Sequence, residues 1–240
     1  MPKHPRKPKD KFKVMHNVFD EFTNRTLFRL ITRGYFEGLE SPIAIGKEAN
    51  IFSAKTKTKG RVMVKIYRLE SCDFNHMYDY LKVDPRFLHL KSKKRKVILA
   101  WVQREYRNLL KAREANMRVP TPLAFLNNVV VLEFIGSGDE IAPRLKDKKP
   151  KNPKKFFEDV ISQIKKLHMA GLVHADLSAF NILNFNEKPV FIDFSQCTTL
   201  KNPHAAEYLN RDVKNISTFF RKLGLKVDEE EIKTKILGKT

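Results

Sequence analysis

Apolar positions along the chain follow two spacings, one typical of strands and one typical of helices. Strand-like runs occur at residues 43–54, 62–67, 123–126 and 129–134, with turns expected at 57–60 and 127–128. Helical spacing predicts helices over residues 19–31, 95–115, 156–169 and 205–220, and short helices at 73–81 and 228–237. The order indicates an α+β fold with an N-terminal helix, a β-rich lobe and a helical lobe.

A polar stretch bounded by short apolar runs, residues 172–196, carries the candidate chemistry. His174, Asp176 and Asn181 stand in the order H-x-D-x-x-x-x-N, and Asp193 follows the apolar run 190–192. A hairpin of residues 182–185 and 190–192, turned at 186–188, would return Asp193 to the vicinity of Asn181. Phosphoryl transfer from ATP uses one carboxylate to orient a hydroxyl, and an amide with a second carboxylate to hold Mg²⁺. The pattern therefore predicts an ATP-dependent phosphotransferase.

The roles of these side chains follow from their charge. Asp176 is the predicted catalytic carboxylate. Asn181 and Asp193 are the predicted ligands of Mg²⁺, with Mn²⁺ as a substitute, and Asn181 also contacts the nucleotide. His174 has a structural explanation, because a neutral imidazole bonded to nearby backbone is the commoner use of such a position.

A lysine in the β-rich part is the expected partner of the phosphates. Lys65 lies between Val64 and Ile66 and needs a partner if it is buried. We expect it to bind the ATP phosphates and to pair with Glu105 in the helix 95–115. The alternative for Glu105 is a solvated glutamate that contacts Lys111 along the same helix.

Two further segments are predicted to contact the nucleotide. Gly46 and Lys47 form the expected turn over the phosphates, although one glycine there also fits an ordinary hairpin. The strand 129–134 ends where a two-lobed kinase crosses between its lobes. There the backbone groups of Glu133 and Ile135 would hydrogen-bond the adenine ring.

Domain boundaries follow from these assignments. We predict a basic flexible tail at residues 1–17, an N-terminal helix with the first lobe at 18–135, and the second lobe at 136–240. Residues 70–94 are polar and contain Asp84-Pro85, which predicts an exposed insertion. No A-P-E segment follows Asp193, so the usual platform for a peptide substrate is expected to be missing.

Composition argues against a membrane-spanning or secreted protein, and it leaves the reason for the high positive charge open. Apolar residues make up 42%, and no apolar run is long enough to cross a membrane or to form a secretory signal. Cys72 and Cys197 lack metal-ligand spacing, which favours reduced thiols in the cytoplasm. The net charge of +20 favours a polyanionic partner such as RNA, but a Lys-rich surface of the kind found in thermophile proteins is the alternative. Residues 144–155 alone carry seven cations.

Seven segments together resemble the RIO family of atypical serine/threonine kinases, and specifically its type-one subfamily in the short form of archaeal members. They are GKEANIF, MVKIY, REYRNL, VLEFIG, LVHADLSAFNIL, FIDFSQ and RDVKNISTFF. The resemblance implies a trimmed protein-kinase fold, ATP and Mg²⁺, autophosphorylation, ATP hydrolysis, and association with maturing small ribosomal subunits and their RNA. The chain departs from the family at Ala44 and Ile45, where Ser and Thr are usual, and at Ala179 and Phe180, where Glu and Tyr are common.

Three functions remain open on the sequence. The first is a serine/threonine protein kinase of unknown protein substrate. The second is an ATP-gated assembly factor that binds pre-ribosomal RNA or protein, with little protein kinase activity. The third is a small-molecule kinase, which shares H-x-D-x-x-x-x-N but carries a larger C-terminal helical region than 44 residues after Gln196 allow.

Overall fold

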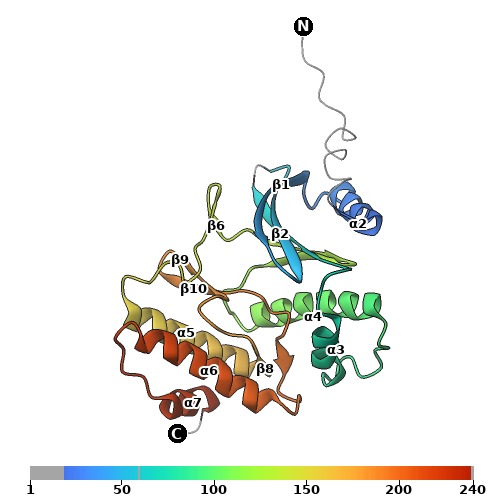
Figure 1. Ribbon diagram of the computed structural model, residues 1–240. Helices are drawn as coiled ribbons and strands as arrows, with labels where there is room; N and C mark the ends of the chain where they lie inside the picture. The colour runs from blue at the N-terminus through green and yellow to red at the C-terminus, as the bar shows by residue number, and fades with distance from the viewer. Residues whose placement is uncertain (1–18, 59, 239–240) are drawn as a thin grey trace. The chain divides into compact units, whose positions relative to one another are not determined.

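The computed structural model describes residues 19–58 and 60–238, and the chain forms two compact units (Figure 1). The first unit holds the described residues up to Cys72 together with Leu123–Glu133, and the second holds Asp73–Pro122 and the described residues from Phe134 onward. The predicted basic tail at residues 1–17 lies outside the described residues. The predicted lobe boundary after residue 135 stays a prediction, and residues 73–122 group with the second unit.

A five-stranded sheet forms the first unit, with the strand order β1-β2-β3-β5-β4. The pairs β1–β2, β2–β3 and β3–β5 are antiparallel. The strands are β1 (Gly38–Ile45), β2 (Ala49–Lys55), β3 (Arg61–Tyr67), β4 (Pro122–Leu126) and β5 (Val129–Glu133), and the helix is α2 (Glu21–Thr32). Asp20 caps α2, since its carboxylate accepts a hydrogen bond from the Thr23 amide at 2.9 Å.

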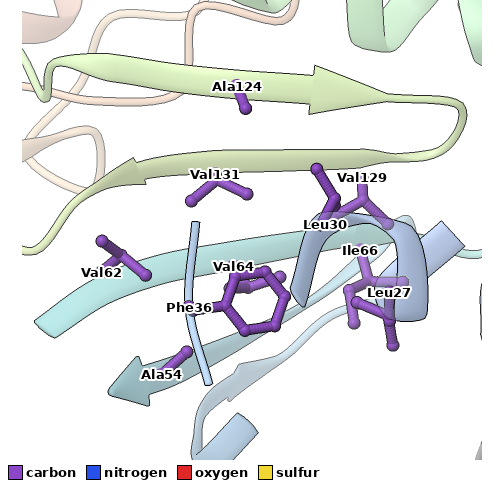
Figure 2. Close-up of a cluster of buried hydrophobic side chains, with 10 residues drawn as sticks. All are labelled: Leu27, Leu30, Phe36, Ala54, Val62, Val64, Ile66, Ala124, Val129 and Val131. Atoms are coloured by element: carbon purple, nitrogen blue, oxygen red, sulfur yellow. The ribbon is translucent and has the colours of Figure 1, made fainter. Parts of the chain in front are cut away.

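Helix α2 covers one face of this sheet with its apolar stripe. Leu27 and Leu30 lie over Ile66 and Val129 in a buried cluster (Figure 2). Full burial of a leucine side chain contributes about 1.5–3 kcal/mol. The Asn128 amide also donates to the carbonyl oxygen of Tyr67 at 2.8 Å, which ties the β4–β5 turn to the end of β3. The N-terminal helix is therefore an integral part of the first unit.

The second unit is mainly helical and carries short two-stranded ribbons. Its helices are α3 (Phe74–Lys82), α4 (Lys94–Glu114), α5 (Pro153–Met169), α6 (Ala205–Arg221) and α7 (Glu229–Leu237). Its strands are β6 (Gly136–Ser137), β7 (Glu140–Ile141), β8 (Leu172–Val173), β9 (Ile182–Phe185), β10 (Lys188–Phe191) and β11 (Thr198–Thr199), paired as β6–β7, β9–β10 and β8–β11. Helix α5 contacts β8 and β10 and so lies against the ribbons that flank the polar stretch.

Most predicted elements are present with ends shifted by one or two residues, including the short helix at 73–81, which is α3. The prediction of an exposed insertion over residues 70–94 is wrong at Asp84, whose exposed fraction is 0%. Its carboxylate is buried because two arginines surround it. Within residues 19–58 and 60–238, each helix is too short or too polar to cross a bilayer.

Candidate active site

The H-x-D-x-x-x-x-N stretch forms a loop between β8 and β9 that is closed by its own side chains. The amide nitrogen of Asn181 donates to the backbone oxygen of Asp176 at 2.8 Å and to its Oδ2 at 2.9 Å. Both N–H groups of the Asn181 side-chain amide are thereby used, so its side-chain oxygen, Oδ1, is the atom left for another ligand. The loop presents a carboxylate and an amide oxygen together.

The predicted β9–β10 hairpin is confirmed, and it determines where Asp193 lies. Phe191 pairs with Ile182, and the backbone amide of Ile192 donates to the backbone carbonyl oxygen of Asn181 at 3.0 Å. Asp193 follows directly, with a φ of +62° that few non-glycine residues adopt. Ser195 Oγ donates to Asp193 Oδ1 at 2.7 Å and fixes the orientation of the carboxylate. The strained backbone turns the chain sharply at this residue.

The charges of the loop favour a bound cation. Burial raises the pKa of Asp176 above its ordinary value, and the neighbouring Asp193 carboxylate raises it further, against the opposing effects of Asn181 and Arg211. A nearby cation would stabilise two carboxylates that repel each other.

The donor set fits Mg²⁺, because Asn181 and Asp193 offer oxygen atoms only and Mg²⁺ takes few protein ligands beside water and phosphate. No group of three or more His, Cys, Asp or Glu side chains within residues 19–58 and 60–238 forms a self-sufficient metal site.

His174 has the structural role expected of it. Its Nε2 donates to the Ile192 carbonyl oxygen at 3.1 Å, and its ring packs against Phe194 with centroids 4.9 Å apart. Complete burial lowers the pKa of His174 to about 4. The imidazole is therefore neutral at pH 7 and bonds the loop to Ile192, the residue that follows β10.

Asp212, in α6, binds the backbone of the loop. The sequence did not predict this role. Its carboxylate accepts hydrogen bonds from the backbone amides of Ala175 at 2.9 Å and Leu177 at 2.8 Å. Ala175 has a φ of +66°, and its carbonyl oxygen accepts a hydrogen bond from Arg211. Burial raises the pKa of Asp212 to about 7, although the two amides and Arg211 favour its charged form. These contacts join the backbone on both sides of Asp176 to α6 and so fix its position relative to that helix.

The remaining predicted site residues are divided between the two units. Lys65 lies in β3 opposite Val130 and is buried, with its ammonium 5.0 Å from the centroid of the Tyr67 ring. Glu105 lies in α4 of the second unit and is 1% exposed, so the alternative of a solvated glutamate is wrong. The pairing of Lys65 with Glu105 stays a prediction.

The turn between β1 and β2 contains Gly46 and Lys47. The Gly46 amide donates to the Ala49 carbonyl oxygen at 3.0 Å, and a Cβ on Gly46 would lie 2.9 Å from the same oxygen. A side chain at this position would force the turn to open. Lys47 is exposed in the same turn. Glu133 ends β5 in the first unit, whereas Ile135 lies in the second unit directly before β6 and is buried.

Comparison with known proteins identifies the family. Residues 50–232 match the RIO domain. The chain belongs to the RIO family. The RIO-type serine/threonine-protein kinase Rio1 of Haloferax volcanii is 40% identical over 232 residues, which cover 97% of this chain and 80% of that protein. The Rio1 kinase of Methanocaldococcus jannaschii is 39% identical over 235 residues, which cover 98% and 80%. The predicted resemblance is confirmed, archaeal relatives included.

Solved structures agree on the fold. The Rio2 kinase of Chaetomium thermophilum, in a complex described as ADP/Mg²⁺-phosphoaspartate, has a TM-score of 0.69 and 22% identity, and the match covers 91% of this chain and 67% of that one. The predicted protein-kinase-like fold is confirmed. This RIO protein is a serine/threonine protein kinase, and membership of the family implies ATP and Mg²⁺ as its cofactors. The relatives give no support to Mn²⁺.

Proposed function

We propose that Asp176, Asn181 and Asp193 carry the phosphoryl transfer of this RIO kinase to a serine or threonine hydroxyl of a protein. The observation that carries the assignment is the Asn181 amide, which binds Asp176 through both donors and leaves its oxygen for a metal. Asn181 and Asp193 would hold Mg²⁺. The ion, when bound, would neutralise charge on the β- and γ-phosphates.

The proposed step uses Asp176 as the proton acceptor. The substrate hydroxyl oxygen forms a bond to the γ-phosphorus, the bond from that phosphorus to the bridging oxygen breaks, and ADP leaves. Asp176 orients the hydroxyl and takes up its proton. The raised pKa makes Asp176 a stronger base than an ordinary carboxylate. Lys65, held by Glu105, would pair with the α- and β-phosphates, and the Gly46-Lys47 turn would cover them.

The experiment that tests the function is incubation of the purified chain with Mg²⁺ and ATP labelled at the γ-phosphate. We expect phosphoserine or phosphothreonine on the chain itself, as autophosphorylation, and none in Asp176→Asn. Free phosphate and ADP without a stable phosphoserine or phosphothreonine would contradict autophosphorylation and favour ATP hydrolysis.

ATP hydrolysis is the second candidate function, and the phosphoaspartate named for the Rio2 complex favours it. A carboxylate of Asp176 or Asp193 would form a bond to the γ-phosphorus, ADP would leave, and water would then cleave the acyl phosphate and restore the carboxylate. Phosphate on the chain that hydroxylamine removes would support this route, and each Asp→Asn variant would identify the acceptor.

We also propose a ribosomal partner, which is more specific than the kinase function alone. The basic segment, residues 144–155, is bonded to the catalytic loop: the Lys146 amide donates to the Ala179 carbonyl oxygen at 3.1 Å, and the Leu145 amide to that of Ile182 at 2.8 Å. Lys146 lies 4.5 Å from the centroid of the Phe180 ring, which is 54% exposed. Fixed cations beside an exposed aromatic ring suit RNA. We propose the maturing small ribosomal subunit and its RNA as the cytoplasmic partner.

A further inference from the structure

A buried polar cluster lies in the second unit beside the backbone that follows Asp193. We call it the buried arginine cluster, and its members are Asp84, Arg86, Arg104 and Asn108. Asp84 Oδ1 accepts hydrogen bonds from the Arg86 amide at 3.0 Å and from its Nε at 2.9 Å, and Oδ2 accepts from its Nη2 at 2.7 Å. The remaining guanidinium nitrogen of Arg86, Nη1, donates to Asn108 Oδ1 at 2.7 Å. Asp84 also forms an ion pair with Arg104 at 3.4 Å.

The cluster binds three backbone carbonyl oxygens of one short segment. Arg104 donates from Nη2 to the carbonyl of Gln196 at 2.7 Å and from Nε to that of Cys197 at 3.0 Å. The Asn108 amide donates to the carbonyl of Cys197 at 2.6 Å and to that of Phe194 at 2.9 Å. Residues 194–197 therefore take their conformation from side chains of α4.

Stability alone is a poor explanation for the buried arginine cluster. Asp84, Arg104 and Asn108 are each 0% exposed, and burying charged groups costs free energy that their mutual attraction returns only in part. Arg104 Nη1 and the Trp101 indole nitrogen are also buried without a hydrogen-bond partner among the described residues. Apolar side chains would fill the same space without these costs. What the cluster provides instead is directional contact with one backbone segment.

That segment begins one residue after the proposed metal ligand. Asp193 has a left-handed backbone, so its neighbours must hold it in that conformation. Phe194 and Ser195 are buried, and Ser195 carries the hydroxyl that binds the Asp193 carboxylate. A shift of the carbonyls at 194–197 would move both the Asp193 backbone and the Ser195 hydroxyl.

We propose that the buried arginine cluster positions Asp193, so that Asp84 and Arg86, which lie before α4, set the geometry of the Mg²⁺ site. The proposal rests on the proposed function, in which Asp193 binds Mg²⁺. It makes Asp84, Arg86, Arg104 and Asn108 positioning residues, since none of them belongs to the loop that meets the substrate. Outer partners of a metal ligand typically contribute 10–100-fold to metal affinity or activity, by the order of magnitude known from other metal sites.

Arg86→Met is the main test, because the side chain of Arg86 is 24% exposed and the residue lies outside α4. We expect the half-saturating Mg²⁺ concentration for ADP formation to rise about tenfold, with kcat recovered at high Mg²⁺. Arg107→Met is the control, since Arg107 is an exposed arginine of α4, the helix that carries Arg104 and Asn108. Partial unfolding would lower the active fraction and kcat without changing the Mg²⁺ requirement, so the two effects are separable.

A second readout does not depend on activity. Backbone amide hydrogen exchange over residues 194–198, measured without Mg²⁺ or ATP, should speed up about tenfold in Arg86→Met and in Asn108→Leu, and stay unchanged in Arg107→Met. Unchanged exchange together with an unchanged Mg²⁺ requirement in both variants would overturn the proposal. A lower kcat with neither change would also overturn it, because that pattern marks a purely structural role.

Asp193→Asn, measured in parallel, separates this proposal from the proposed function. If Asp193→Asn keeps Mg²⁺-dependent turnover, the metal assignment fails, and the positioning proposal falls with it even if exchange over residues 194–198 responds. If Asp193→Asn is inactive while Arg86→Met and Asn108→Leu behave as wild type, only the positioning proposal fails.

Discussion

The side-chain amide of Asn181 donates to both the backbone oxygen and the carboxylate of Asp176, at 2.8 and 2.9 Å. One side chain thus closes the loop, fixes the rotamer of the proposed base and leaves its own oxygen for the proposed metal. A serine or alanine at position 181 would lose all three effects together. The five-residue spacing of the motif is therefore a geometric requirement of the loop.

Replacing the proposed base tests its role directly. We expect Asp176→Asn to lower kcat by roughly 10²–10⁴, because the amide cannot accept the proton of the hydroxyl, while the KM for ATP changes little. Steady-state phosphorylation assays measure both constants. Asp159→Asn is the control, since Asp159 lies in α5 and forms an ion pair with the exposed Lys188. A kcat near the wild-type value in Asp176→Asn would remove Asp176 from the reaction.

Ser195→Ala tests the orientation of the second carboxylate. The variant loses the 2.7 Å hydrogen bond to Asp193 Oδ1, and the carboxylate gains rotational freedom. We expect the half-saturating Mg²⁺ concentration to rise roughly tenfold, with a smaller effect on kcat. Ser195→Thr keeps the hydroxyl and should recover part of the affinity. Equal Mg²⁺ requirements in all three proteins would show that the hydroxyl does not position Asp193.

The buried imidazole of His174 predicts a stability change with pH. Its pKa is about 4 in the folded state, against an ordinary value of 6.5. The unfolded chain therefore binds a proton that the folded chain excludes, and the contribution to the free energy of unfolding is lost as pH falls from 6.5 to 4, by roughly 3 kcal/mol at most. His174→Gln keeps a donor but cannot titrate. We expect urea unfolding to be less pH-dependent in the variant than in the wild type across this window.

Asp212 changes the free energy of unfolding with pH in the opposite direction to His174. Only the difference between the wild type and His174→Gln is therefore informative. Its pKa of about 7 in the folded state lies above the ordinary 3.8, so the folded chain binds the extra proton. This term lowers the free energy of unfolding as pH rises from 3.8 to 7. Both proteins contain Asp212, and its effect cancels in the comparison. Parallel pH profiles for wild type and His174→Gln would contradict a low pKa for His174.

Sequence reasoning found the elements and motif residues whose signals are local. The H-x-D-x-x-x-x-N spacing and the 182–192 hairpin each depend on a few neighbouring residues, and the structure has both. The buried state of Asp84 was not predicted, because Asp-Pro in a polar stretch is typical of exposed loops. Its burial follows from Arg104, 20 residues further along the chain, which no local pattern reveals.

A signal for the missed residues does exist in the helices. Asp212 lies on the apolar stripe of α6 with Leu209, Val213 and Ile216, where a carboxylate needs donors from elsewhere. Arg104 and Asn108 likewise stand among the buried positions of α4. A charged or amide side chain at helical spacing with apolar neighbours therefore indicates a buried hydrogen-bonded site, although its partners come only from the tertiary structure.

Lys65→Met tests the phosphate role assigned to the first unit. The side chain is buried in β3 between apolar neighbours, and methionine keeps the length of its apolar stem. If Lys65 pairs with Glu105 as proposed, the variant also leaves a buried carboxylate without its cation, so we expect a lower thermal stability as well. We expect kcat/KM for ATP to fall by about 10²-fold, since the phosphates would lose a buried cation. Thermal unfolding without nucleotide serves as the control. An unchanged kcat/KM would mean that Lys65 packs against Tyr67 and does not meet ATP.

The basic segment at residues 144–155 predicts salt-dependent RNA binding. Lys148, Lys149 and Lys151 are exposed, and the backbone beside them is bonded to the catalytic loop. Replacing all three with glutamine should weaken binding to single-stranded RNA and reduce the slope of log K against log salt by about 2, since each lost phosphate contact lowers it by about 0.7. Fluorescence anisotropy at several salt concentrations measures both quantities.

A charge-matched control makes this last prediction specific to one surface. Lys214, Lys222 and Lys226 are exposed in and after α6, and their replacement by glutamine changes the net charge by the same amount. If the basic segment binds RNA, the control triple variant keeps most of the slope. Equal losses in both triple variants would indicate attraction to the whole charge of +20 rather than to a site. A slope near zero in the wild type would favour a Lys-rich surface without an RNA partner, because contacts with phosphates must release counterions.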